Sequence, residues 1–299
     1  MRIDIRRVVL LLLWVVLHGQ AFAQSGGQPL LWKATSATNI VYLFGTIHVG
    51  SKAFYPLHPN VEEAFDRSKV IALEADPTDQ VDLAAALAKA GYRPPDRIDN
   101  HISAKLANDL RKSLPGMGFP LEAARLMKPY LLSMALSMME LGKLGYEAQY
   151  GLDIHFAQRT KHEHKKLMEL ESVTGQLALF DALSPAVQEA MLQSTLETIR
   201  SGAMAADLKE LISAWQAGDE AHLLEMVNRD TRDLPPAAKE ETKRIFYDSR
   251  NQAMAEKIAH ILETAQEAHF VAIGAGHLPG DKGIVELLRK MGFAVSRVR

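Results

Sequence analysis

The sequence predicts an α/β (α+β) fold: a central mixed sheet flanked by many helices, with a large helical region in the middle of the chain. Three observations lead to this prediction. Short apolar runs bounded by polar or turn residues, which are typical of buried strands, gather near both ends of the chain. Long segments with helical patterning and start signals lie between them. Strands alternate with helices near both ends, and this order favours a helix-covered sheet over a helical bundle.

The predicted strands are mostly short apolar runs. They are Leu30 to Thr35, Ile40 to Phe44, Val70 to Leu73, Lys166 to Leu170, Phe270 to Ile273 and Ala294 to Val298. Two of them continue into similar sequences, VYLFGTIH and FVAIGAGH, and each leads through a short turn into a helix. This likeness leaves open whether the fold has two pseudo-symmetric halves, because eight residues cannot establish a duplication.

The helices are predicted from their patterning and their first residues. Proline at a first helical position marks the helix from Pro59 to Asp66 and the helix that opens at Pro129, and Ser184-Pro185 indicates an N-cap followed by proline. The other predicted helices are Val81 to Ala90, Ala203 to Gln216, Glu220 to Asn228, Ala237 to Tyr247 and Gln252 to Thr264. The helix after Pro129 contains Met134, Met138 and Met139, which we interpret as core packing.

The N-terminus has the layout of a secretory signal peptide. Three arginines precede an apolar run from Val8 to Leu17, and Ala21-Phe22-Ala23 forms an A-x-A cleavage site. The run is about half of the 20 apolar residues that a spanning helix needs. The sequence therefore predicts a cleaved segment over 1–23, a short linker over 24–29 and a single domain over 30–299, in a periplasmic or secreted protein without a membrane anchor after cleavage.

Charge and composition exclude several classes of function. Removing the signal peptide takes away three arginines and one aspartate, which changes the formal net charge from −2 to −4. A mildly acidic chain lacks the electrostatic footprint of a nucleic-acid-binding protein. The chain has no cysteine, so disulfides, thiolate metal sites and a cysteine nucleophile are excluded.

The strongest candidates for chemistry are the two Gly-x-x-His turns, Gly45 to His48 and Gly274 to His277. Each places an imidazole just past the end of a strand, where ligands of open α/β sheets bind. Glycine allows the backbone to turn sharply or to approach a ligand closely. A histidine at a strand end is commonly a structural hydrogen-bonding group, but two such turns more than 200 residues apart favour one shared site.

Carboxylates follow the next strand. Glu74 and Asp76 lie two residues apart in VIALEADP, so they point to the same side if the strand continues. Glu74 is the better candidate for a metal ligand or general base, whereas Asp76 is as readily explained as a loop cap beside proline. Asp153 is predicted either to serve the start of a helix or to point into the site.

The remaining candidates are weaker. His155 could be a ligand, but a histidine in this position is more often a packing or surface residue, and His162 and His164 are interpreted as part of a solvated loop in KHEHKK. Arg250 and Asn251 begin a helix, and the guanidinium is suited to an anionic group or a developing oxyanion. The sequence contains no HExxH helix, GxSxG elbow, P-loop or GxGxxG fingerprint.

Taken together, six segments resemble the TraB/PrgY/GumN family, to which the Tiki metalloproteases are similar. They are FGTIHVG, VIALEAD, YGLDIHF, KLMELESVTGQLALF, DSRNQAMAEKI and FVAIGAGHLPGDKGIVELLRKMGFAV, in that order along nearly all of the mature chain. In that family two Gly-x-x-His motifs, a glutamate and an arginine are regarded as catalytic. The resemblance therefore implies catalytic roles for His48, Glu74, Arg250 and His277, with Gly45 and Gly274 in the turns.

The resemblance also implies an activity. Animal members act as manganese- or cobalt-dependent proteases, so we expect a metal-dependent hydrolase, most simply a peptidase acting on a peptide or protein. His48, His277 and Glu74 are the expected ligands of manganese or cobalt, with zinc not excluded. Asp153 and Asn251, with the two turn glycines, are expected to support binding. Two alternatives stay open on this scaffold: a non-catalytic protein that binds a ligand, haem or a partner, and a metal-free esterase.

Overall fold

The computed structural model describes residues 27–230 and 236–299 and confirms the predicted α/β architecture. The described residues form a six-stranded mixed sheet with the order β4-β3-β5-β2-β1-β6. The strands are β1 (Leu31–Thr35), β2 (Ile40–Thr46), β3 (Val70–Leu73), β4 (Lys166–Glu169), β5 (His269–Gly274) and β6 (Ala294–Arg297). Each lies within two residues of the range that the sequence predicts.

Four neighbouring strands, β4, β3, β5 and β2, are parallel, whereas β1 and β6 add an antiparallel margin. The central strands β2, β3 and β5 are buried along almost their whole length, as expected for near-continuous apolar runs in a parallel sheet. The carboxyl ends of the four parallel strands meet at one edge of the sheet. The residues that follow these strands are therefore brought close together.

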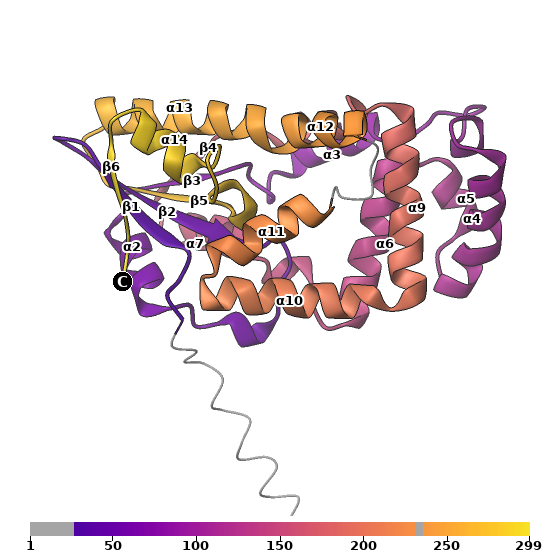
Figure 1. The fold of residues 1–299 in the computed structure, drawn as a ribbon, viewed down its shortest axis with the longest axis horizontal. Helices are drawn as coiled ribbons and strands as arrows, with labels where there is room; N and C mark the ends of the chain where they lie inside the picture. Colours follow the sequence, from indigo (N-terminus) through magenta and orange to yellow (C-terminus); the bar gives the residue numbers. More distant parts are fainter. Residues whose placement is uncertain (1–26, 231–235) are drawn as a thin grey trace, which may run out of the picture.

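Helices surround the sheet and extend well beyond it (Figure 1). The α-helices are α2 (Pro59–Arg67), α3 (Gln80–Lys89), α4 (Ala104–Met117), α5 (Leu121–Arg125), α6 (Pro129–Lys143), α7 (Leu152–His162), α8 (Val173–Asp181), α9 (Pro185–Ser201), α10 (Ala203–Ala217), α11 (Glu220–Asp230), α12 (Pro236–Lys243), α13 (Ser249–Thr264) and α14 (Ile284–Lys290). Short 3₁₀ segments include η3 (Ala148–Tyr150) and η5 (Ala275–His277), and η4 (Arg244–Asp248) is a π-helical segment.

The two largest of the four apolar clusters in residues 27–230 and 236–299 pack separately. The larger core surrounds the sheet and includes Phe44, Phe156 and Phe270, whose rings lie 4.9 to 6.0 Å apart. The smaller core joins α4, α5, α6 and α9 through residues such as Leu132 and Leu192. In Figure 1 the sheet lies at the left and these four helices at the right, with α10 and the α12–α13 segment running between them. The sheet edge and α9 therefore belong to separately packed layers.

Several helical predictions need correction. Residues 236–264 form a continuous helical stretch, because the π-helical η4 joins α12 to α13 where the sequence predicts two helices. The sequence pattern does not predict α4, α5 or α8. Ser184 occupies the N-cap position of α9, but its side chain makes no capping hydrogen bond. Met134 and Met138 are 38% and 39% exposed, so they are not core residues as predicted.

The predicted signal peptide, residues 1–23, and the first part of the predicted linker lie outside the described residues. Within residues 27–230 and 236–299, the structure contains no helix with the length and apolar character needed to cross a membrane.

Candidate functional site

A cleft of about 610 Å³ lies between the carboxyl edge of the parallel strands and the α9 layer. His48, Arg250 and His277 line its sheet side. Side chains from α6, α8, α9, α11, α12 and η4 line the remainder: Ser133, Phe180, Ala190, Met191, Gln193, Ser194, Thr195, Glu197, Val227, Thr242, Phe246 and Tyr247. The cleft therefore contains both predicted histidines and the predicted arginine.

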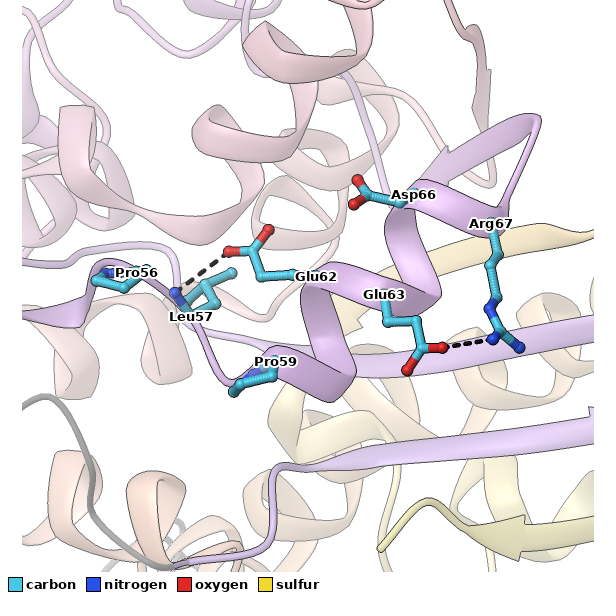
Figure 2. A pocket seen from close by; sticks show the side chains of 7 residues that line it. All are labelled: Pro56, Leu57, Pro59, Glu62, Glu63, Asp66 and Arg67. Atoms are coloured by element: carbon cyan, nitrogen blue, oxygen red, sulfur yellow. Dashed lines mark hydrogen bonds and ion pairs between the residues drawn. The ribbon is translucent and has the colours of Figure 1, made fainter.

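A second hollow of similar volume lies on the surface of α2 (Figure 2). No histidine lines it. Its carboxylates already have partners: Glu62 and Asp66 pair with Arg159, and Glu63 pairs with Arg67 at 2.5 Å. This hollow lacks the chemistry of the cleft, so we place the candidate site in the cleft.

His48 follows β2 and is anchored by Asp153 in the first turn of α7. The Nδ1–H of His48 donates to Asp153 Oδ2 at 2.8 Å, while Thr46 donates to Oδ1 at 2.8 Å. The negative charge of Asp153 raises the pKa of His48 to about 9. The side chain of His48 is 71% exposed, whereas Asp153 is buried. Asp153 was predicted either to serve the start of the helix or to point into the site, and its side chain points toward His48 in the site.

His277 follows β5, and Asn251 at the start of α13 fixes its orientation. The Asn251 Nδ2 donates to the Lys282 carbonyl at 2.9 Å, which turns Oδ1 toward His277. Because that Oδ1 can only accept, His277 Nδ1 donates to it at 2.6 Å, and the ring lone pair lies at Nε2. Burial lowers the pKa of His277 to about 4, so the ring is neutral at pH 7.

Glu74 follows β3 and is buried between these histidines and Arg250. Its Oε1 accepts from the Gly274 N–H at 2.6 Å and lies 3.8 Å from His277 Nε2. Its Oε2 accepts from Arg250 at 2.7 Å and Gln176 at 2.8 Å. Burial acts to raise the pKa of Glu74, but its interactions with the two histidines, with Arg250 and with the Gly274 N–H outweigh burial and lower the pKa. Glu74 is therefore an ionised carboxylate.

The three groups surround the backbone of Gly274. A Cβ placed on this glycine would lie 3.1 Å from Glu74 Oε1, 3.5 Å from the His277 ring and 3.9 Å from His48 Nε2. The two Gly-x-x-His turns thus contribute to one site, with Glu74 between them. Gly45 has a different role: a Cβ there would lie 3.1 Å from both Leu30 and Leu278, so this glycine serves packing and does not face the cleft.

Arg250 lies between two carboxylates. Its Nη2 donates to Glu74 at 2.7 Å and to Glu171 at 2.6 Å, and its Nε donates to Glu171 at 2.9 Å. Its Nη1 makes a longer bond, 3.3 Å, to the Phe246 carbonyl. The guanidinium therefore binds both Glu74 and Glu171 through Nε and Nη2. The contact with an oxyanion that the sequence predicts stays a prediction, and Nη1 is the nitrogen that makes no bond to a carboxylate.

The donor chemistry of this site fits a divalent cation. Both histidines have Nδ1 bound to an oxygen acceptor, as metal-binding histidines usually do, and Glu74 supplies a carboxylate oxygen. The 3.8 Å between His277 Nε2 and Glu74 Oε1 suits two ligands of one ion, since metal–ligand distances are roughly 2.0–2.2 Å. However, no set of three His, Cys, Asp or Glu side chains within the described ranges is grouped closely enough to hold a metal.

The other predicted candidates lie outside the cleft. Asp76 accepts from Thr78 and pairs with Lys161 at 2.8 Å, as the loop-cap interpretation predicts. His155 packs against Tyr55, with ring centroids 4.5 Å apart. His162 is the last residue of α7 and His164 follows the helix, so only part of the KHEHKK segment is the predicted loop.

Two polar residues at the site have no role in the sequence prediction. Glu171 and Gln176 lie in the KLMELESVTGQLALF segment and contact Arg250 and Glu74. The available signal is positional: Glu171 follows β4 much as Glu74 follows β3. Tyr247 also belongs to the site, because its ring lies 5.4 Å from that of His277.

Comparison with known proteins identifies the family of this chain. The model of the TraB/PrgY/gumN family matches residues 30–297. The chain belongs to this family. Among its relatives is the uncharacterized protein YbaP of Escherichia coli (strain K12), which is 25% identical over 281 residues, covering 93% of this chain and 97% of YbaP.

Other relatives of the chain are named as proteases. Metalloprotease TIKI1 of Danio rerio is 23% identical over 299 residues, which are 85% of this chain and 60% of the relative. Metalloprotease TIKI1 of Homo sapiens is 23% identical over 300 residues, 85% of this chain and 59% of the relative. The chain thus spans about three-fifths of these longer proteins. No solved structure matches the chain significantly.

Proposed function

We propose that this protein is an exported, metal-dependent hydrolase that cleaves peptides or proteins. The observation that supports this most strongly is the grouping of His48 Nε2, Glu74 Oε1 and the His277 ring around Gly274. The names of the TIKI1 relatives support the reaction class. The cleft of about 610 Å³ is large enough for several residues of an extended substrate.

Each residue of the site has a distinct part in this proposal. A bound divalent cation, held by His48, His277 and Glu74, would polarise the scissile carbonyl and lower the pKa of a bound water to about 7. His277 is already a neutral imidazole with its lone pair at Nε2. His48 has to release a proton before its Nε2 can bind a cation. Arg250 keeps Glu74 ionised and in place, and its Nη1 remains the candidate for oxyanion stabilisation.

Hydrolysis of a peptide library by the mature protein, with and without Mn²⁺ or Co²⁺, tests the proposal. We expect cleavage that depends on the cation and falls by at least about 100-fold in His48→Ala and in His277→Ala. His162→Ala is the matched control, since this histidine lies at the end of α7 and outside the cleft, and should cleave like the wild type.

Three results would contradict the proposal. The hydrolase assignment is wrong if the folded wild type binds the cation but cleaves no peptide. Hydrolysis of esters that survives a chelator would favour the metal-free esterase, with a histidine as base. Tight binding of an unchanged ligand or haem in the cleft, without turnover, would favour the non-catalytic alternative.

Export is a separate part of the proposal and rests on the sequence of residues 1–23. N-terminal sequencing of the protein expressed with its full leader should return a chain that begins at Gln24 and that fractionates with the periplasm or the medium. A chain that keeps the leader and stays in the cytoplasmic fraction would contradict export without affecting the hydrolase proposal.

A further inference from the structure

Glu171 is the contribution of the fourth parallel strand to the same sheet edge. Past the ends of β3 and β4 the backbone pairing continues, with Leu170 N–H donating to Leu73 and Glu171 N–H donating to Glu74 at 2.8 and 2.6 Å. The side chain of Glu171 is 18% exposed and that of Glu74 is 5% exposed. Two carboxylates are therefore fixed side by side against Arg250, which lines the cleft.

The hydrogen bonds of Arg250 are divided unequally between these carboxylates. Glu171 accepts from both Nε and Nη2 in a bidentate arrangement, whereas Glu74 accepts only from Nη2. Two carboxylates and one guanidinium leave this cluster with a net charge of −1. If Glu171 were neutral, Arg250 would compensate Glu74 completely, and the cluster would have no net charge to offer a cation.

Gln176, in the first turn of α8, links the two carboxylates. Its Nε2 donates to Oε2 of Glu74 at 2.8 Å and to Oε2 of Glu171 at 3.0 Å. Both Gln176 and Arg250 thus bind the same oxygen of Glu74, Oε2. Their common effect is to turn Oε1 toward Gly274 and His277, the side on which the two imidazoles lie.

We propose that Glu171 and Gln176 are positioning residues of the cation site, with Glu171 compensating Arg250 so that Glu74 keeps its negative charge, and Gln176 directing Oε1 toward the histidines. This inference rests on the proposed function only in that a divalent cation binds at Glu74. It concerns the affinity for the cation and requires no substrate.

Direct titration of the purified protein with Mn²⁺ alone, by calorimetry or electron paramagnetic resonance, tests this inference. Glu171→Gln should weaken Mn²⁺ binding by about 10- to 100-fold, the usual effect of losing a partner of a metal ligand. Gln176→Met should weaken binding by about tenfold. Glu171→Asp keeps the charge and should recover part of the affinity that Glu171→Gln loses, which a purely structural role would not require.

A matched control and a double mutant sharpen the experiment. Glu163→Gln removes one carboxylate that pairs with Arg159 beyond the far end of α7, and should leave Mn²⁺ affinity unchanged. If Glu171 acts by compensating Arg250, then Glu171→Gln should have little further effect in an Arg250→Met background. Circular dichroism on each variant checks that it is folded.

The inference is overturned if folded Glu171→Gln binds Mn²⁺ as tightly as the wild type, or if its loss is the same with and without Arg250. It is also overturned if the wild type binds no Mn²⁺. If the wild type binds Mn²⁺ and the variants show the expected affinities, but no peptide is hydrolysed, the inference is supported and the hydrolase proposal is contradicted. If hydrolysis depends on the cation but Glu171→Gln binds Mn²⁺ as tightly as the wild type, the hydrolase proposal is supported and the inference is contradicted.

Discussion

At the scale of single residues, the two cleft histidines differ in the partner of Nδ1. His48 donates to a carboxylate and His277 to a neutral amide, and this difference accounts for the opposite directions of their pKa shifts together with the deeper burial of His277. The structure therefore predicts one cationic and one neutral imidazole at neutral pH in the cation-free protein.

The tautomer of His277 is open to direct measurement. In cation-free protein, ¹⁵N NMR of the ring should show a protonated Nδ1 and an unprotonated Nε2 at pH 7. Asn251→Leu removes the acceptor and should lower Mn²⁺ affinity by about 10- to 100-fold. A wild-type His277 with its proton on Nε2 would contradict the arrangement, because that nitrogen would have no lone pair for a cation.

The pair of His48 and Asp153 predicts a pH dependence of stability in the cation-free protein. The folded pKa of His48 is about 9, above the ordinary 6.5, so the contribution of the pair is complete below pH 6.5 and disappears as the pH rises through about 9. The difference in free energy of unfolding between wild type and Asp153→Asn should therefore be larger at pH 6 than at pH 10. Denaturant unfolding with a chelator present measures it, and a difference that grows with pH would contradict the pairing.

At the scale of elements, the start of α7 packs tightly against the turn after β2. A Cβ on Gly151 would lie 2.1 Å from the carbonyl oxygen of His48, and the backbone N–H of Leu152 donates to Ile47 at 3.1 Å. This contact brings Asp153 to His48. A residue larger than glycine cannot fit without moving one of the two segments.

Gly151→Ala should accordingly destabilise the fold by about 1–3 kcal/mol, since overpacking at a rigid contact costs this much. It should also displace His48 and weaken Mn²⁺ binding. Gly142→Ala in α6 is the matched control: nothing lies within 4 Å of its added Cβ, so stability should stay the same or rise by up to about 1 kcal/mol. Thermal unfolding and cation titration of both variants give the result, and equal behaviour would contradict the close contact.

The strands were the part of the fold that the sequence predicted best, and the site predictions depended on them. His48, Glu74 and His277 each follow a buried apolar strand, so strand ends together with the repeated Gly-x-x-His turn were enough to propose them. Glu171 follows β4, whose four side chains are exposed or only partly buried. Gln176 acts through a side-chain amide at the start of α8, a helix that the sequence did not predict. Such a contact depends on three-dimensional packing that no local pattern encodes.

At the scale of the whole molecule, the cleft lies between two cores that pack separately. The sheet core holds the strand ends. On the opposite wall, α6 and part of α9 pack in the smaller core of α4, α5, α6 and α9, whereas Phe180, Met191 and Phe246 pack in a further apolar cluster. Sequence periodicity predicted α9 and the start of α6, but not that they stand apart from the sheet. The position of the wall depends on which helices share a core. Leu114, Leu136 and Leu196 pack in one core although they are distant in sequence, and no local pattern predicts that contact.

The smaller core should therefore be necessary for stability. Leu192→Ala in α9 removes a fully buried side chain and should lower the free energy of unfolding by about 2–5 kcal/mol. Leu87→Ala in α3 is the matched control, because Leu87 is 45% exposed and its truncation should cost clearly less. Chemical denaturation of both variants tests this, and equal losses would contradict the assignment of α9 to a packed core.

The central claim is that the two Gly-x-x-His turns and Glu74 hold one divalent cation. A crystal structure of the protein soaked with Mn²⁺ tests it most directly, with anomalous scattering to identify the ion. We predict one Mn²⁺ bound by His48 Nε2, His277 Nε2 and a carboxylate oxygen of Glu74, each at roughly 2.0–2.3 Å. An ion bound elsewhere, or a cleft in which these three groups stay too far apart to share one ion, would contradict it.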